Sequence, residues 1–488
     1  MITLFLPTWL VGQPSLSVAR LSVRRPPLSE LAQLPESRLP RFVRESEVAL
    51  QYLRLLGPLD WSQFPDRPDQ RFHPQWPPLP YAPFVAAYLV KIDQHLPYMA
   101  DLRDYLVAHP ALVWALGFPL VRSRAFSWGF DVQASLPTHR HLSRLLRTLP
   151  NTAPQFLLDE TVRLLRDALP PKVPFGQTVA LDTKHVIAWV QENNPKSYVT
   201  DRYDKTKQPT GDPDCRLGCK RRHNQAPGRQ SIEDWPTPRA NAQPVKGHSV
   251  GEFYWGYGSG VVATQVAEWG EFVLAELTQP FDQADVSYFH PLMAHTERRL
   301  GFRPLYGAFD AAFDAFYVYE HFHRPGAEGF AAVPLVARGG HGQREFDADG
   351  LPLCAAGLPM PLLATFWCRT GLIEHERGRY GCPLRFPEPV GVACPVNHKN
   401  WAKKGCVSTL ATSPGARLRY QLDRESAAYK DVYRQRTATE RINSQAVAFG
   451  IERPKLRNGR SIANHNTLTY VLINLHALSR VRQRQAER

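Results

Sequence analysis

Apolar residues along this chain follow two different spacings, and the change between them divides it. Between Pro83 and about Leu169 they recur every three or four positions, which predicts amphipathic helices. From residue 171 onward they gather into short runs bounded by polar residues and glycines, as buried strands do. Residues 1–80 are rich in Pro and Arg and show few long periodic segments, so we expect mostly loop or extended chain there.

One helical stretch, residues 136–149, has a basic face. Thr138 stands where an N-cap residue would, and three arginines follow at helical spacing: Arg140, Arg144 and Arg147. A small helical DNA-binding module has this pattern, and so does an ordinary amphipathic helix with a basic outer face. The pattern alone leaves both interpretations open.

Two of the predicted strands carry a carboxylate where the apolar run ends. The run 178–182 ends in Asp182, and the run 304–310 ends in Asp310. Between them lie three more strand patterns, at 252–258, 260–266 and 271–277, and a helical pattern at 285–300. A further helix and the strand pattern 329–336 follow, so the predicted fold class is α/β with a mixed sheet.

The patterns also predict how the chain is organised. We expect an N-terminal segment at residues 1–82 and a helical DNA-binding domain at 83–170. A core follows in two parts, at 171–336 and 421–488, and an insertion subdomain at 337–420 lies between them. Residues 191–247 are polar, basic and irregular, which predicts a long loop inside the core. Because no run reaches about 18 apolar residues, we expect a soluble, cytoplasmic protein with no membrane contact.

The charge narrows the class of partner. The 488 residues include 59 Lys and Arg against 45 Asp and Glu, a formal net charge of +14. Such an excess favours a polyanionic partner, and nucleic acid fits it best. The seven cysteines are too few, and odd in number, for a secreted disulfide scaffold.

A helical stretch near the C-terminus brings three polar groups together. Within residues 423–448, Tyr433, Arg436 and Glu440 stand at i, i+3 and i+7, so one helix would place them on one face. A carboxylate beside a guanidinium and a phenol suits a metal ion next to a phosphate. An ordinary solvated helix face is the alternative. Asp182 and Asp310 favour the first interpretation, because three carboxylates can hold two divalent cations for attack on a phosphodiester.

With these residues in place, the sequence from about Pro83 to Leu478 resembles the DDE transposases of bacterial insertion sequences. Three segments carry the resemblance: Ala180-Leu-Asp182-Thr-Lys-His, Gly307-Ala-Phe-Asp310-Ala-Ala-Phe-Asp314, and Tyr433-Arg-Gln-Arg436-Thr-Ala-Thr-Glu440. The last matches the family signature Tyr-x2-Arg-x3-Glu. The full signature continues with a Lys after six more residues, where this chain has Val447.

The resemblance implies an RNase H-like, retroviral-integrase-like core with a large insertion before the catalytic Glu. It assigns Asp182, Asp310 and Glu440 as ligands of two Mg²⁺ (or Mn²⁺) ions, with Asp314 as the fallback for Asp310. It also assigns DNA contacts to four residues, Tyr433, Arg436, Arg441 and Lys455, of which Lys455, or Arg453, would take the role of the missing signature Lys. A Trp that stacks on a flipped base is implied too, but the sequence does not identify it.

The implied activity is cleavage at insertion-sequence ends and strand transfer into target DNA. The partners would be double-stranded DNA, both element ends and target, and a second copy of the chain assembled on that DNA in the bacterial nucleoid. Two other functions stay open: a related nuclease that cuts without joining, and a DNA-binding protein that has lost catalysis. A strand-transfer assay separates all three, since only a transposase joins DNA.

The insertion contains a possible structural zinc site. Four residues, Cys382, Cys394, His398 and Cys406, supply three thiolates and an imidazole, which is a ligand set for tetrahedral Zn²⁺. Their spacings match no standard zinc finger. Reduced cysteines without a metal are the alternative.

Overall fold

The structure is a computed structural model of the 488-residue chain. It describes residues 28–31, 33–65, 80–221, 251–326, 328–336 and 344–488. The chain divides into two compact units, residues 1–156 and 157–488, and each is described by itself. Arg222, Arg229 and Arg239 of the predicted basic loop lie outside the described residues.

The first unit is helical. Its longer helices are α3 (Glu47–Leu56), α4 (Ala82–Asp93), α5 (Met99–Ala108), α6 (Pro110–Leu116) and α8 (His139–Thr148). The shorter elements are α1 (Leu28–Leu31), η2 (Glu36–Arg38), α2 (Arg41–Arg44), β1 (Val121–Arg122), β2 (Phe130–Asp131) and α7 (Val132–Ser135). Helix α9 (Thr152–Ala168) begins in this unit and continues into the second. The well-formed α3 was not expected in a stretch rich in Pro and Arg, and it is stabilised by the Ser46 hydroxyl, which caps its N-terminus.

The helix predicted with a basic face is confirmed as α8. The Thr138 hydroxyl accepts a hydrogen bond from the His141 N–H, as an N-cap does. Three leucines of α8 are buried, Leu142, Leu145 and Leu146, while its three arginines, Arg140, Arg144 and Arg147, are exposed. The first unit therefore presents a short basic helix face to solvent.

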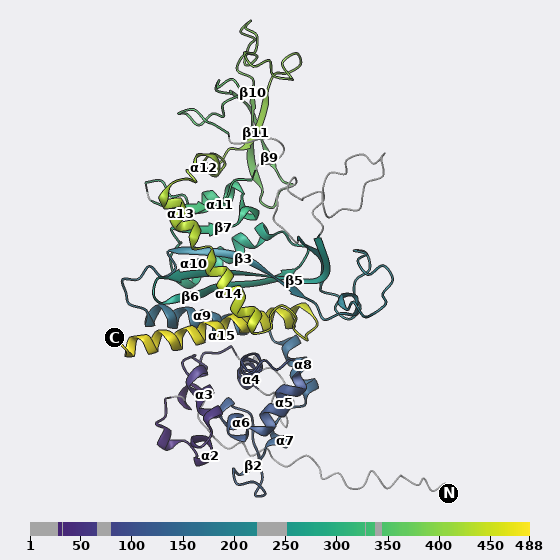
Figure 1. Ribbon diagram of the computed structural model, residues 1–488, viewed down its shortest axis with the longest axis vertical. Helices are drawn as coiled ribbons and strands as arrows, with labels where there is room; N and C mark the ends of the chain where they lie inside the picture. Colours follow the sequence, from purple (N-terminus) through teal and green to yellow (C-terminus); the bar gives the residue numbers. More distant parts are fainter. Residues whose placement is uncertain (1–27, 32, 66–79, 222–250, 327, 337–343) are drawn as a thin grey trace, which may run out of the picture. The chain divides into compact units, whose positions relative to one another are not determined.

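The second unit is a mixed α/β structure, which confirms the predicted class. Its sheet contains β3 (Thr178–Ile187), β4 (Arg216–Arg221), β5 (Gly251–Val266), β6 (Gly270–Pro280), β7 (Tyr306–Phe309) and β8 (Phe330–Ala332). The strand order is β4-β5-β3-β7-β8, and β6 pairs with the remaining part of β5. β3, β7 and β8 are parallel, whereas β5 runs antiparallel to β3, β4 and β6. Figure 1 shows this curled sheet at the centre of the unit.

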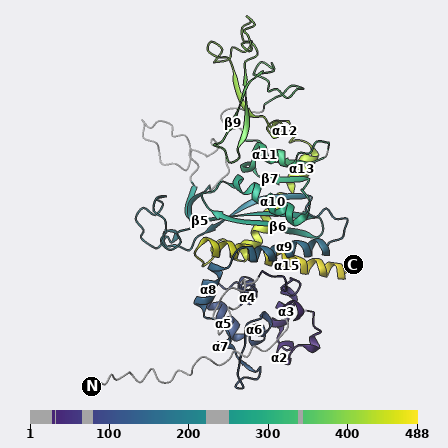
Figure 2. The same ribbon diagram turned by 180° about the vertical axis from the view of Figure 1, so that it is seen from behind.

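Helices cover the sheet on both faces (Figures 1 and 2). On one side η5 (Asp285–Tyr288) and α10 (Phe289–Leu300) pack so closely that a Cβ on Gly260 would touch Tyr288 and Leu292. On the other side α13 (Ala427–Arg434) and α14 (Thr437–Ala448) pack against β7, β3 and β5. The 28-residue helix α15 (Gly459–Ala486) lies along β6. The remaining elements are η3 (Gln191–Asn193), η6 (Ala311–Phe313), α11 (Phe316–Phe322) and α12 (Gly415–Gln421).

Three local expectations were wrong. β4 is a strand within the stretch predicted as irregular loop, since its backbone pairs with β5. The two strand patterns at 252–258 and 260–266 form the single strand β5, because the glycines between them fit beneath Tyr288 instead of turning the chain. The helical stretch 423–448 is broken after Arg434, and Arg436 becomes the N-cap residue of α14.

The insertion contains its own small sheet, of order β11-β10-β9. Its strands are β9 (Leu362–Cys368), β10 (His375–Gly381) and β11 (Val407–Ala411), all antiparallel. They lie in the sequence between β8 and the helices α13 and α14. No helix in the described part of the chain is both long enough and apolar enough to cross a membrane.

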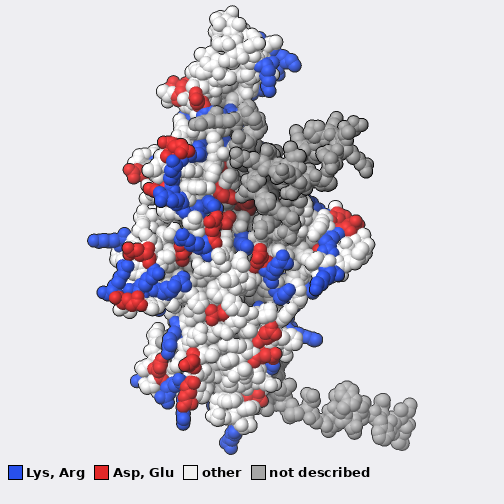
Figure 3. All heavy atoms as spheres, in the orientation of Figure 1, with Lys and Arg blue, Asp and Glu red and all other residues white. Residues whose placement is uncertain are grey.

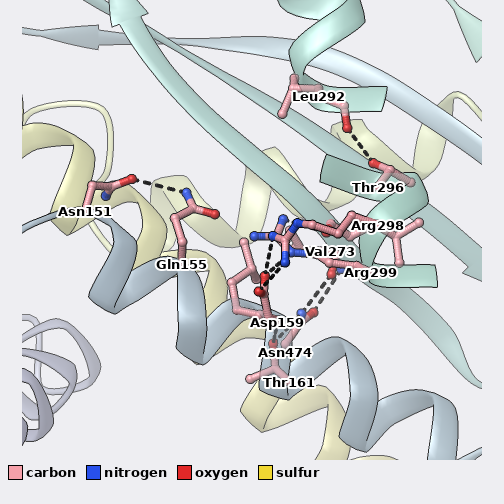
Figure 4. Close-up of polar contacts among 12 residues, drawn as sticks. Asn151, Gln155, Asp159, Thr161, Val273, Leu292, Thr296, Arg298, Arg299 and Asn474 are labelled. Atoms are coloured by element: carbon pink, nitrogen blue, oxygen red, sulfur yellow. Dashed lines mark hydrogen bonds and ion pairs between the residues drawn. The ribbon is translucent and has the colours of Figure 1, made fainter. Parts of the chain in front are cut away.

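A polar cluster fastens α9 and α10 to each other. Arg298 and Arg299 of α10 both bond the Asp159 carboxylate of α9, at 2.7 and 2.5 Å (Figure 4). Nearby, the Asn474 amide of α15 donates to the Thr161 hydroxyl and the Val273 carbonyl. The helices therefore hold fixed positions around the sheet.

Candidate active site

Asp182 and Asp310 lie side by side where two parallel strands end their pairing. β3 and β7 are paired in parallel up to Leu181 and Phe309, and each aspartate is the next residue on its strand. Neighbouring strands are about 4.8 Å apart, so the two carboxyl groups are close neighbours. The sequence analysis predicted an Asp at the end of each apolar run, and the sheet brings the two together.

Their shared environment raises the pKa of both aspartates. Burial is the main cause for Asp182, and the negative charges of Asp310 and Asp285 add to it, which raises its pKa to about 6. Burial also raises the pKa of Asp310, and Asp285 again contributes. The Arg436 guanidinium acts in the opposite direction on both groups, without cancelling the shift.

Asn443 holds the Asp182 side chain from α14. Its Nδ2 donates to Asp182 Oδ2 at 3.0 Å, and the backbone N–H of Thr183 donates to the other carboxylate oxygen at 2.9 Å. Asn443 is nine-tenths buried, and its Oδ1 has no hydrogen-bond partner among the described residues. The sequence analysis missed this residue, although it stands one helical turn after Glu440 and shares its side of the helix.

Asp285 is a second residue that the sequence analysis did not assign to the site. Its Oδ1 accepts a 2.7 Å hydrogen bond from the Thr183 hydroxyl, directly beside Asp182. It comes from η5, which packs against η6 just after Asp310. No sequence signal identifies it, because Asp285 is 103 residues from Asp182 in the chain and only the fold makes them neighbours.

Tyr433, Arg436 and Glu440 also come together, although the helix that was to hold them is broken. The Arg436 guanidinium lies 6.0 Å from the Tyr433 ring centre and donates to Glu440 Oε1 at 2.6 Å. Arg436 also lies within electrostatic reach of Asp182 and Asp310. The three residues thus sit on the same side of the sheet as the two aspartates.

Glu440 does not complete a three-carboxylate group with the aspartates in this structure. Its half-exposed carboxylate is engaged by Arg436. No three Asp, Glu, His or Cys side chains gather closely enough to hold a metal ion anywhere in the described parts of the chain. The donor chemistry still fits a hard cation at the aspartate pair, since carboxylate oxygens and the unpartnered Asn443 Oδ1 are the atoms Mg²⁺ prefers.

Asp314, the predicted fallback for Asp310, is enclosed elsewhere, and that prediction was wrong. Its side chain is fully buried and accepts hydrogen bonds from Arg419 Nε at 2.6 Å, the Tyr319 hydroxyl at 2.8 Å and the Val336 N–H at 2.7 Å. Burial alone would raise the pKa of Asp314, but these bonds and the Arg419 charge hold it below the ordinary value. With both oxygens occupied, Asp314 anchors α12 to the core.

The two other residues predicted to contact DNA, Arg441 and Lys455, differ in whether their charge is already paired. Arg441 pairs with Glu271 of β6, so its guanidinium is already engaged. Lys455 is exposed, with its ammonium 5.9 Å from the centre of the Trp189 ring. Only Lys455 is available to an additional anionic partner.

The predicted zinc ligands are only partly brought together. The Cys406 thiol lies within hydrogen-bond reach of Cys382, and burial, with these neighbouring thiols, raises its pKa to about 12. A third thiol, Cys354, lies nearby, whereas the His398 imidazole accepts a hydrogen bond from the Asn400 N–H. Cys394 belongs to a separate turn, closed by the Asn397 N–H on its carbonyl. The zinc site stays a prediction.

No protein-family model and no curated protein matches this sequence. The site therefore has to be interpreted from its own geometry.

Proposed function

We propose that this protein is a metal-dependent DNA transposase of the DDE type, which cuts at the ends of an insertion sequence and joins them to target DNA. The observation that carries the proposal is that Asp182 and Asp310 directly follow Leu181 and Phe309, the last paired residues of two parallel strands. Two neighbouring carboxylates with raised pKa values lower the stability of the fold, and such pairs are common at catalytic sites.

The order of elements supports an RNase H-like core. One aspartate stands on the central strand β3, the other follows β7, and Glu440 lies on the later helix α14. The small sheet β9–β11 falls between β8 and that helix, where the resemblance implies a large insertion. Mixed strand directions around β3 agree with this interpretation.

Asp182 and Asp310 would hold a divalent cation, with Asn443 orienting Asp182 through its amide. When bound, such an ion supplies charge stabilisation to the phosphoryl group and a more acidic attacking water. Glu440 would join this set only if a DNA phosphate drew Arg436 away from it. The Arg436–Glu440 contact is partly solvent-exposed, so this exchange costs less free energy than breaking a buried ion pair.

Arg436 and Tyr433 would position the scissile phosphate. A guanidinium can bond two phosphate oxygens at once, and Arg436 lies beside both aspartates. The basic face of α8 and the net charge of +14 would contribute sequence-independent affinity for DNA.

A paired assay of cleavage and binding tests the proposal. The substrate is the DNA that flanks the gene, with its terminal inverted repeats, in Mg²⁺. Glu440→Gln should lose cleavage and strand transfer by at least about a hundredfold, because several kcal/mol of transition-state stabilisation are removed. Its gel-shift affinity should stay close to that of the parent, since phosphate contacts elsewhere provide the binding.

Arg436→Ala should lose both rate and positioning of DNA, and Arg434→Ala is its matched control. Arg434 is the last residue of α13, is exposed, and pairs with Asp431 of the same helix. A Glu440→Gln protein that cuts as well as the parent contradicts the assignment of Glu440. A parent that cuts without joining is the related nuclease, and one that binds DNA without cutting is a protein that has lost catalysis.

A further inference from the structure

Between α14 and α15, three exposed cations alternate with buried residues. Arg453, Lys455 and Arg457 are exposed, while Pro454 and Leu456 between them are buried. The backbone bends at Arg453 and at Lys455, so this segment is an irregular loop and not a strand. We call the three cations on the solvent side of this loop the row.

The row is fastened at both ends to the sheet. The Glu452 carbonyl accepts from the Ile187 N–H at 2.8 Å, and the Glu452 carboxylate pairs with Lys184 at 3.5 Å. At the far end the Asp214 carboxylate accepts from the Asn458 amide at 2.8 Å and from the Gly459 N–H at 2.9 Å. The backbone beneath the cations is therefore held in place before any partner arrives.

Trp189 orders two of the three cations. Its ring centre lies 4.8 Å from the Arg457 guanidinium carbon and 5.9 Å from the Lys455 ammonium. Arg457 Nε also donates to the Trp189 carbonyl at 3.3 Å. A partly exposed Trp thus holds a Lys and an Arg at a fixed separation.

We propose that Arg453, Lys455 and Arg457, ordered by Trp189, form a binding row for phosphates of DNA. The inference rests on the proposed function and extends it by a second contact region. Three exposed cations on a loop whose backbone is fastened at both ends match a polyanionic partner, and a nucleic-acid backbone offers several phosphates close together. Lys184 links the row to β3, the strand that carries Asp182.

The balance of charge agrees with this partner. The two acidic groups beside the row, Glu452 and Asp214, are both engaged by the contacts that fasten it. Within the described part of the chain, Arg453, Lys455 and Arg457 form no ion pair. Figure 3 shows Lys and Arg mixed with Asp and Glu over much of the visible surface.

The row begins near the candidate site and leads away from it. Arg453 follows Glu452, which pairs with Lys184, two residues after Asp182, whereas Lys455 and Arg457 lie against Trp189, seven residues after Asp182. The row would therefore hold DNA that extends away from the aspartates.

The test is the salt dependence of DNA binding, measured by fluorescence anisotropy on a short duplex of arbitrary sequence. The triple variant Arg453→Gln, Lys455→Gln, Arg457→Gln should reduce the slope of log affinity against log salt by about 2.7, or 0.9 for each phosphate lost. The relative affinity of parent and variant should then change by about fortyfold over a fourfold change in salt.

A matched control removes the same charge elsewhere. Arg38→Gln, Arg41→Gln, Arg54→Gln changes three exposed arginines of the first unit, two of them already paired with glutamates. Its slope should stay within about one unit of the parent's. Trp189→Ala keeps every charge, so it should keep the slope while weakening binding several-fold.

Equal salt slopes for the parent and the row variant would overturn the proposal. So would a control variant whose slope falls as much as that of the row variant. These outcomes can be told apart from failure of the proposed function. If the parent protein cleaves and joins DNA while the row variant binds DNA normally, the proposed row is wrong and the proposed transposase function stands. If the parent protein binds no duplex DNA at low salt, both the row and the proposed function are wrong.

Discussion

Two pairs of aspartates in the second unit differ in what surrounds them. Asp314 and Asp159 face arginines, and although burial works against it, the bonds and charges of those arginines lower the pKa of each carboxyl group. Asp182 and Asp310 face each other and Asp285 instead, and their pKa values are raised. Backbone N–H groups that bond the two carboxylates and the Arg436 guanidinium oppose that shift without cancelling it.

The difference separates structural carboxylates from candidate catalytic ones. A carboxylate that exists to stabilise the fold is surrounded by donors, as Asp159 is in Figure 4. Asp182 and Asp310 keep raised pKa values despite the donors that bond them, so their ionised forms destabilise the folded protein at neutral pH. A bound cation would supply the compensating charge. Three measurements test this distinction.

The largest effect is expected at Asp314. Asp314→Asn should lower the free energy of unfolding by about 3 kcal/mol, because Arg419 keeps its charge and loses its buried partner. Chemical denaturation measures this. Asp431→Asn is the matched control, since that carboxylate forms an exposed pair with Arg434 and should change stability by less than about 0.5 kcal/mol. Equal losses in the two variants would mean that Asp314 is not an anchor.

A smaller effect of the opposite sign is expected at Asp182. Its pKa in the folded protein, about 6, exceeds the ordinary 3.8, so the folded state binds more protons than the unfolded state between these values. Stability due to this group is therefore full below about pH 4, falls as pH rises, and is lost above about pH 6. Asp182→Asn should stabilise the metal-free protein by about 2 kcal/mol at pH 7.5, after a discount for partial exposure.

The check is a series of thermal melts from pH 4 to pH 8 for the parent and Asp182→Asn. The two curves should meet near pH 4 and separate as the parent carboxylate ionises. Parallel curves across the whole range would show that Asp182 is well compensated, and the contrast with Asp314 would disappear.

The smallest effect is the response to Mg²⁺. A cation that binds the aspartate pair of the folded protein should stabilise it by about 1.4 kcal/mol at ten times its dissociation constant. Asp182→Asn should respond much less. The measurement is the melting temperature in Mg²⁺, without any DNA. The melting temperature in NaCl at equal ionic strength controls for charge screening. A parent that gains nothing from Mg²⁺ would contradict a cation site at Asp182 and Asp310.

The sequence alone determined the local features of this protein. Apolar spacing identified the helix α8 with its Thr138 cap, and it gave the mixed α/β class. It also predicted that Asp182 and Asp310 would each follow an apolar run. These features follow from residues that are near one another in the chain, where side-chain periodicity directly reflects local backbone geometry.

Only the tertiary structure decided which carboxylates share an environment. Asp314 fits the sequence motif as well as Asp310 does, yet Arg419, 105 residues later, binds it and excludes it from the site. Asn443 and Asp285 contact the surroundings of Asp182 across 261 and 103 residues, and the packing of α14 and η5 puts them there. Charge and burial depend on such distant neighbours, so no local pattern can give a pKa or a ligand set.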